Sequence, residues 1–181
     1  MADLSDERAF YYVDGIPTKG VWIDLDSITD EDDIKQALAD AGLIPTDDED
    51  QVTGTPQYDG DLLVATVDGV VAKYCLSSHD CFDLAEWQKI RDDTERKKHW
   101  SAEAVAAYLG YAGSWSKSDF EDVYQGEHDN EESFAEQLFD DLGYDRELPE
   151  HLRMYFDMTA FARDLFIDDY YFNDGFVFRR N

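Results

Sequence analysis

The 181-residue chain carries 43 Asp and Glu residues against 15 Lys and Arg residues, a formal net charge of −28 at pH 7. Hydrophobic residues make up 43% of the chain and aromatic residues 14%, which suffices for a core and excludes a disordered acidic chain. Because nucleic acid and anionic lipid repel such a chain, we expect a basic protein surface as its partner, with no direct nucleic-acid binding and no membrane contact.

The first segment has the patterns of an antiparallel sheet with one helix. Residues 9–13 and 20–25 are rich in aromatic and β-branched residues, which favour strands. The acidic run 30–33 precedes an apolar stripe at helical spacing in residues 34–41. These patterns predict two strands, followed by a helix that ends at Gly42.

A hairpin is the next predicted element. Residues 45–61 have the composition of a loop, and the apolar runs 62–67 and 70–76 follow it. The two runs flank Asp68-Gly69, a dipeptide typical of the tightest β-turns. The pattern therefore predicts two paired strands joined at this turn.

The rest of the chain reads as short helices and a final hairpin. Asn130 and Pro149 stand where a helix cap and a first-turn proline belong, and Gly143 stands where a helix ends. The closing hairpin pairs 170–172 with 176–178 around Asn173-Asp174-Gly175. The helices are predicted over residues 84–90, 102–109, 120–124, 131–142, 149–155 and 159–166.

This order of elements predicts an α+β fold. A length of 181 residues suits one domain or two to three small ones. We expect an N-terminal α+β domain over residues 1–80, a small helical domain over 81–125, and a C-terminal α+β domain over 126–181.

Charge is distributed in blocks. No Lys or Arg occurs between Gln36 and Ala72 or between Ser118 and Asp145, whereas basic residues cluster within 89–98. B-DNA carries one charge per about 1.7 Å, so 28 uncompensated charges correspond to roughly 48 Å of duplex. Adaptation to high salt also produces an acidic surface, but it would suppress lysine more evenly along the chain. The function of the basic cluster is left open.

The candidate partner-binding residues are the carboxylates of the two acidic blocks. Three of them, Glu132, Glu136 and Asp140, lie four residues apart on a predicted helix and face the same way, which costs a few tenths of a kcal/mol per pair. Either this is an ordinary solvated face, or a cationic partner relieves the repulsion. The full set is Asp47, Asp48, Glu49, Asp50, Asp119, Glu121, Asp122, Glu127, Asp129, Glu131, Glu132, Glu136, Asp140, Asp141 and Asp145.

Motifs of catalysis and metal binding are weak. The acidic runs lack the glycine of a calcium loop, and Cys75, His79 and Cys81 lie at no zinc-site spacing. Acidic pairs for hydrolysis carry no specificity in so acidic a chain. These motifs indicate no metal, no cofactor and no specific catalytic residue, and a hydrolase that uses an acidic pair stays open as an alternative. Two cysteines and a start without signal-peptide features indicate a cytoplasmic protein.

Several segments resemble the ArdA antirestriction family. They are VYQGEHDNEESFAE (123–136), LPEHLRMYFD (148–157) followed by AFARDL (160–165), GFVFR (175–179) and, near the start, GVWIDL (20–25). Residues 45–98 depart from the family pattern.

This resemblance implies a non-enzymatic protein of mobile genetic elements that acts in the cytoplasm of a bacterial host. It implies elongated, three-domain homodimers whose carboxylates mimic bent B-form DNA. Such proteins occupy the DNA-binding groove of type I restriction–modification enzymes, at the methyltransferase core and the specificity subunit. An alternative is a salt-adapted or acidic interaction module that binds another basic partner. Within 148–165, the aromatic residues Tyr155, Phe156 and Phe161 either belong to the core or form a dimer contact.

Overall fold

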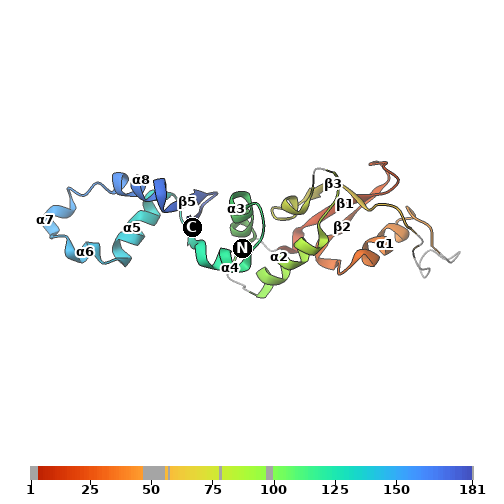
Figure 1. Ribbon diagram of the computed structural model, residues 1–181, viewed down its shortest axis with the longest axis horizontal. Coiled ribbons are helices and arrows are strands. Elements are labelled where there is room, and N and C mark those ends of the chain that lie inside the picture. The colour runs from red at the N-terminus through yellow and green to blue at the C-terminus, as the bar shows by residue number, and fades with distance from the viewer. Residues whose placement is uncertain (1–3, 47–55, 57, 78, 97–99, 181) are drawn as a thin grey trace. The chain divides into compact units, whose positions relative to one another are not determined.

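The computed structural model describes residues 4–46, 56, 58–77, 79–96 and 100–180. The chain divides into two compact units, Met1–Gly113 and Ser114–Asn181, each with a three-stranded antiparallel sheet and helices (Figure 1). The predicted α+β class is thus confirmed, whereas the division into three domains remains a prediction.

The first unit is organised around a sheet with the strand order β2-β1-β3. The strands are β1 (Arg8–Tyr12), β2 (Gly20–Asp24) and β3 (Leu63–Asp68). Tyr11 in the central strand pairs with Val21 on one side and Val64 on the other. The strands predicted over 9–13 and 20–25 are therefore confirmed, with ends that differ by one residue.

Helices pack beside this sheet and complete the core of the first unit. They are the 3-10 helices η1 (Leu4–Asp6), η2 (Leu25–Ser27) and η3 (Ala72–Cys75), and the α-helices α1 (Glu31–Asp40), α2 (Leu84–Arg96) and α3 (Ala102–Ala112) (Figure 1). Ile34 and Leu38 from the predicted apolar stripe of α1 are fully buried, as are Trp87 and Ile90 of α2. The periodicity therefore identified these helices correctly, although α2 and α3 extend beyond the predicted ends.

The predicted hairpin around Asp68-Gly69 is wrong in its second half. Residues 63–68 do form β3, but this strand pairs with β1, and the chain after Gly69 enters η3 rather than a second strand. The cause is distant in sequence: the Glu7 carboxylate accepts hydrogen bonds from the backbone N–H groups of Val70, Val71 and Ala72. In a second strand, these backbone N–H groups would pair with a neighbouring strand. Here the Glu7 carboxylate satisfies them instead, at the start of η3.

The second unit has a sheet with the order β4-β6-β5. Its strands are β4 (Tyr124–Glu127), β5 (Tyr170–Asn173) and β6 (Phe176–Arg179). Asp174 and Gly175 both have positive φ, 50° and 90°, as the tight turn between paired strands requires. The predicted C-terminal hairpin is confirmed, whereas β4 was not predicted.

Most helices of the second unit come between β4 and β5 in the sequence. They are α4 (Lys117–Val123), α5 (Glu131–Asp141), α6 (Tyr144–Glu147), α7 (Glu150–Arg153) and α8 (Met158–Asp168). α5 packs against α8, with α6 and α7 at the end of this pair away from β5 (Figure 1). Phe134, Phe166 and Val177 form the core beneath this pair. Across the described residues, no helix is long and apolar enough to cross a membrane.

Candidate functional site

Ten of the predicted carboxylates lie exposed on consecutive elements of the second unit. They are Asp119, Glu121, Asp122, Glu127, Asp129, Glu131, Glu132, Glu136, Asp140 and Asp141. Their exposure makes them accessible to a partner. Their role in binding one remains a prediction.

Helix α4 carries three of these carboxylates and is anchored by its apolar side. The Ser116 side chain caps the helix by accepting a hydrogen bond from the backbone N–H of Asp119 at 3.4 Å. Phe120 is fully buried and stacks on Tyr124, with ring centroids 4.9 Å apart. The buried side of the helix thus fixes the backbone from which its carboxylates project.

Helix α5 carries five of the carboxylates on a well-capped backbone. The Asn130 side chain accepts a hydrogen bond from the Ser133 N–H at 2.9 Å, and the Ser133 hydroxyl accepts one from the Asn130 N–H at 3.2 Å. This reciprocal pair satisfies two backbone donors at the helix start. Phe134 and Phe139 are buried on the inner side. The Thr159 hydroxyl of α8 also donates to Glu132 Oε1 at 3.0 Å, which fixes that carboxylate.

Two further carboxylates lie at the end of β4 and in the link from β4 to α5. The backbone N–H of His128 donates to the Gly175 carbonyl at 2.8 Å, and the His128 ring contacts Phe134 edge-on, at 5.1 Å between centroids. Glu127 and Asp129 flank this anchored histidine and are both exposed. The acidic residues of α4, β4 and α5 therefore follow one another along residues 119–141, on an ordered backbone.

Few cations oppose these charges. Residues 114–181 contain 18 Asp and Glu residues and 6 Lys and Arg residues, a formal net charge of −12. Arg163 pairs with Asp164 at 2.9 Å, while Arg180 donates to the backbone carbonyls of Tyr170 and Phe166. Among the described side chains of α5, Glu131, Glu136, Asp140 and Asp141 form no ion pair.

For five of the predicted carboxylates, the exposure of the side chain is not described. Asp47, Asp48, Glu49 and Asp50 lie outside the described residues. The backbone of Asp145 lies in α6.

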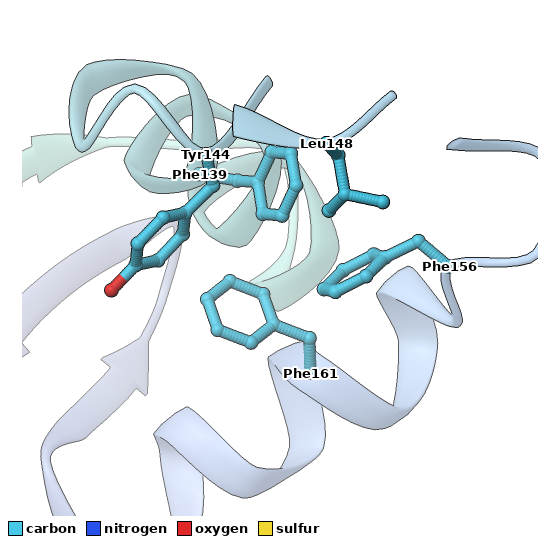
Figure 2. A pocket seen from close by; sticks show the side chains of 5 residues that line it. All are labelled: Phe139, Tyr144, Leu148, Phe156 and Phe161. Carbon is cyan, nitrogen blue, oxygen red and sulfur yellow. The ribbon is translucent and has the colours of Figure 1, made fainter. Parts of the chain in front are cut away.

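The aromatic residues predicted as a dimer contact divide into two groups. Phe156 and Phe161 pack with Phe139, with ring centroids 4.6 and 5.9 Å from that of Phe139. Together with Tyr144 and Leu148 they line an open apolar pocket of about 320 Å³, into which Phe139, Leu148, Phe156 and Phe161 point (Figure 2). Tyr155 instead has 77% of its surface exposed. The core interpretation thus fits Phe156 and Phe161 in part, and Tyr155 is available for contact with a partner.

Sequence reasoning did not include the acidic first turn of α1 among the candidates. It used residues 30–33 only as a helix-start signal. In the structure Glu31 and Asp32 are exposed, and the Asp30 side chain caps the helix by accepting from the N–H groups of Asp32 and Asp33. The density of charge at this turn was the signal that could have identified it.

In the part of the chain that the structure describes, the side chains suited to covalent or metal chemistry are not gathered into a site. Cys75 is buried, and burial raises the pKa of its thiol to about 12, which suppresses the reactive thiolate. Within the described ranges, no group of three or more His, Cys, Asp or Glu side chains is arranged to hold a metal ion. The arrangement instead offers a fixed, strongly anionic surface.

A comparison with known protein families gives a match over nearly the whole chain. The model of the family described as antirestriction protein (ArdA) matches residues 10–178, nearly the whole chain. No individually curated protein matches the chain.

Proposed function

The chain belongs to the ArdA family of antirestriction proteins, and from this membership we propose that it inhibits type I restriction–modification enzymes by presenting carboxylates in place of DNA phosphates. In this proposal it works by binding rather than by catalysis, in the cytoplasm of a bacterial host that has received a mobile genetic element. Its target is the DNA-binding groove formed by the methyltransferase core and the specificity subunit.

The density of charge on α5 is the observation that carries this proposal. An 11-residue helix is about 16 Å long at 1.5 Å per residue. Its five exposed carboxylates therefore give one negative charge per about 3.3 Å of axis, close to the roughly 3.4 Å per phosphate along one DNA strand. By contrast, α8 has the same length but carries only Asp164 and Asp168, and Arg163 pairs with Asp164. The charge spacing along α5 thus resembles that of the phosphates along one DNA strand, which supports the proposal.

Rigid presentation of these carboxylates supports the same proposal. The cap at Asn130 and Ser133 and the buried Phe134 and Phe139 fix the helix before any partner arrives. A pre-ordered ligand loses less conformational entropy on binding, so more of the electrostatic attraction appears as affinity. Because phosphate-like contacts carry no base sequence, one such surface suits enzymes of different DNA specificity.

We also propose that the protein is a homodimer through the segment around Tyr155. Met154 and Tyr155 have 79% and 77% of their surfaces exposed, and the neighbouring Leu152 has 43%. Three adjacent apolar side chains of this exposure favour burial against another protein surface. The open pocket lined by Phe156 and Phe161 lies in the same part of the unit and provides further apolar area.

The test is inhibition of a purified type I restriction–modification enzyme acting on its own DNA substrate. We expect inhibition that added DNA competes away and that weakens steeply as salt rises, since both ligands use the same basic groove. Inhibition that is insensitive to both DNA and salt would contradict the proposal. Circular dichroism provides the control: cooperative folding in dilute buffer excludes a protein that needs molar salt to fold.

A further inference from the structure

Three side chains of α2 hold the segment that leads into α1. The indole Nε1 of Trp87 donates to the Leu25 carbonyl at 3.3 Å, and Nε2 of Gln88 donates to the Thr29 carbonyl at 2.6 Å. Nη1 of Arg91 reaches three carbonyl oxygens, those of Leu25 and Asp26 at 3.5 Å and that of Ile28 at 3.3 Å. One face of α2 thereby satisfies four backbone carbonyls of residues 25–29.

Arg91 is well placed for this role because it is largely shielded from water. Its side chain is 14% exposed, and its remaining contact is with the exposed carboxylate of Asp92, at 3.4 Å. A guanidinium carries several donors in a fixed plane, so one side chain can serve several acceptors together. This cation of the basic cluster is therefore used mainly on backbone carbonyls rather than on the acidic surface.

The held segment is connected directly to the acidic turn of α1. The N–H and hydroxyl of Thr29 donate to Oδ2 of Asp33 at 2.7 and 2.5 Å, and the N–H of Asp30 donates to the same oxygen at 3.3 Å. Asp30 in turn accepts from the N–H groups of Asp32 and Asp33 at 2.9 and 3.1 Å. A rigid series of hydrogen bonds thus runs from α2 through Thr29 to the turn that carries Glu31 and Asp32.

We propose that Arg91, together with Gln88, is a positioning residue that fixes the acidic first turn of α1 for contact with the restriction enzyme. The inference rests on the proposed function and adds a role for a basic residue within it. Arg91 touches no partner. It acts through the carbonyls of residues 25–28, and the carboxylates that it orients are those of Glu31 and Asp32.

An explanation from net charge alone and the positioning role of Arg91 predict opposite effects of removing this residue, so an experiment can distinguish them. Removing any one cation changes the formal net charge from −28 to −29. If the basic groove responded only to charge, every such change would leave inhibition unaltered or strengthen it. If Arg91 positions carboxylates, its removal weakens inhibition although the protein becomes more negative.

The experiment compares three variants in the DNA-cleavage inhibition assay, with the full chain and a purified type I enzyme. Arg91→Ala removes the positioning cation. Lys89→Ala is the matched control, because Lys89 lies on the same helix, is 52% exposed and pairs with Glu86 at 3.5 Å. Gln88→Ala leaves the net charge at −28 and removes only the bond to the Thr29 carbonyl. Each inhibition constant is measured over a series of salt concentrations.

We expect Arg91→Ala to weaken inhibition about tenfold, Gln88→Ala about threefold, and Lys89→Ala less than twofold. The slope of log inhibition constant against log salt should also fall by about 2 in Arg91→Ala, because two carboxylates are no longer held against the groove. Because salt screens the self-repulsion of so acidic a chain, circular dichroism is recorded at each salt concentration, and each inhibition constant is corrected for the folded fraction before the slopes are compared. Amide hydrogen exchange should become faster at residues 29–33 and stay unchanged in β3.

Equal inhibition by Arg91→Ala and Lys89→Ala, or an unchanged salt slope in Arg91→Ala, overturns the inference. If Arg91→Ala does not fold, Gln88→Ala decides the question alone, and inhibition equal to that of the wild type overturns the inference. Failure of the proposed function is a different result, because in that case the wild-type protein itself does not compete with DNA.

Discussion

The side chain of Glu7 fills the space that a Cβ atom on Gly69 would need. Glu7 is only 3% exposed, and its carboxylate accepts from the N–H groups of Val70 and Val71 at 2.8 and 3.1 Å and from that of Ala72 at 2.7 Å. Gly69 has a φ of 154°, a conformation that other residues rarely adopt. Two positions 62 apart in the sequence are therefore tied to each other's geometry.

Gly69→Ala should destabilise the protein by about 2–4 kcal/mol, because the new methyl group displaces Glu7 from its three donors and strains the backbone. Denaturant unfolding measures this free energy. Gly113→Ala is the matched control: Gly113 also has a positive φ, 75°, but nothing lies within 4 Å of its missing Cβ. That variant should lose only about 1 kcal/mol. Equal losses would show that Glu7 contributes nothing.

Thr29→Val should make the protein more sensitive to acid. Hydrogen bonds from the Thr29 side chain and backbone lower the pKa of Asp33 below its usual 3.8. Because the pKa of Asp33 is lower in the folded protein than in the unfolded chain, its ionised carboxylate stabilises the fold at pH values above the unfolded-state pKa. This stabilisation is lost as the pH falls through the folded-state pKa. Without the hydroxyl, the Asp33 pKa rises and acid unfolding begins at a higher pH. NMR titration of the Asp33 carboxyl carbon checks this prediction, and an unchanged pKa contradicts it.

Glu136→Gln combined with Asp140→Asn should affect stability and inhibition in opposite directions. The two carboxylates lie one turn apart on α5, so removing their repulsion stabilises the helix by a few tenths of a kcal/mol. Inhibition of the restriction enzyme should weaken about three- to tenfold, because the groove loses two phosphate-like charges.

The control for this pair is Asp174→Asn, which removes a carboxylate in the β5–β6 turn. Asn tolerates the positive φ of 50° at this position, so the fold is preserved. We expect a change in inhibition of less than twofold. If neutralisation at either place has the same effect per charge, total charge rather than the α5 surface governs binding.

Tyr155→Ser should shift the protein from dimer to monomer in sedimentation velocity. Tyr155 is 77% exposed, so its loss changes the stability of the unit by less than about 0.5 kcal/mol. Ile167→Ser on α8 is the control, since Ile167 is 57% exposed in the same unit. A wild-type protein that is monomeric, or a Tyr155→Ser variant that sediments as the wild type does, rejects this interface.

Local patterns predicted the elements whose interactions are local. The stripe in α1, the Asn130 cap of α5 and the Asn173-Asp174-Gly175 turn all depend on neighbours within a few residues, and all three are present. The strand β4 was missed because it is short and its partner is β6: Tyr124 pairs with Phe178, far along the chain. The error after Gly69 has the same origin, since Glu7 is too distant for any local pattern to include.

For the candidate surface, sequence identified the acidic residues but not what holds them. Blocks of Asp and Glu are visible in the composition, and exposure follows from their charge. The support given to the α1 turn by Gln88 and Arg91 requires knowing that α2 lies against residues 25–29, which no periodicity reveals. In the sequence, Arg91 was only one member of the basic cluster within residues 89–98, whose function was left open.

Pairing of β4 with β6 also has a kinetic consequence. Joining Tyr124 to Phe178 closes a loop of about 50 residues that contains α5, α6, α7 and α8. Closing such a loop costs entropy before its contacts form, so this step should limit the folding rate of the second unit. Because Phe134 of α5 shares its core with Val177 of β6, we expect α5 to open together with the sheet once the loop is closed. Slow hydrogen exchange should then extend from β6 through α5 as one cooperative unit.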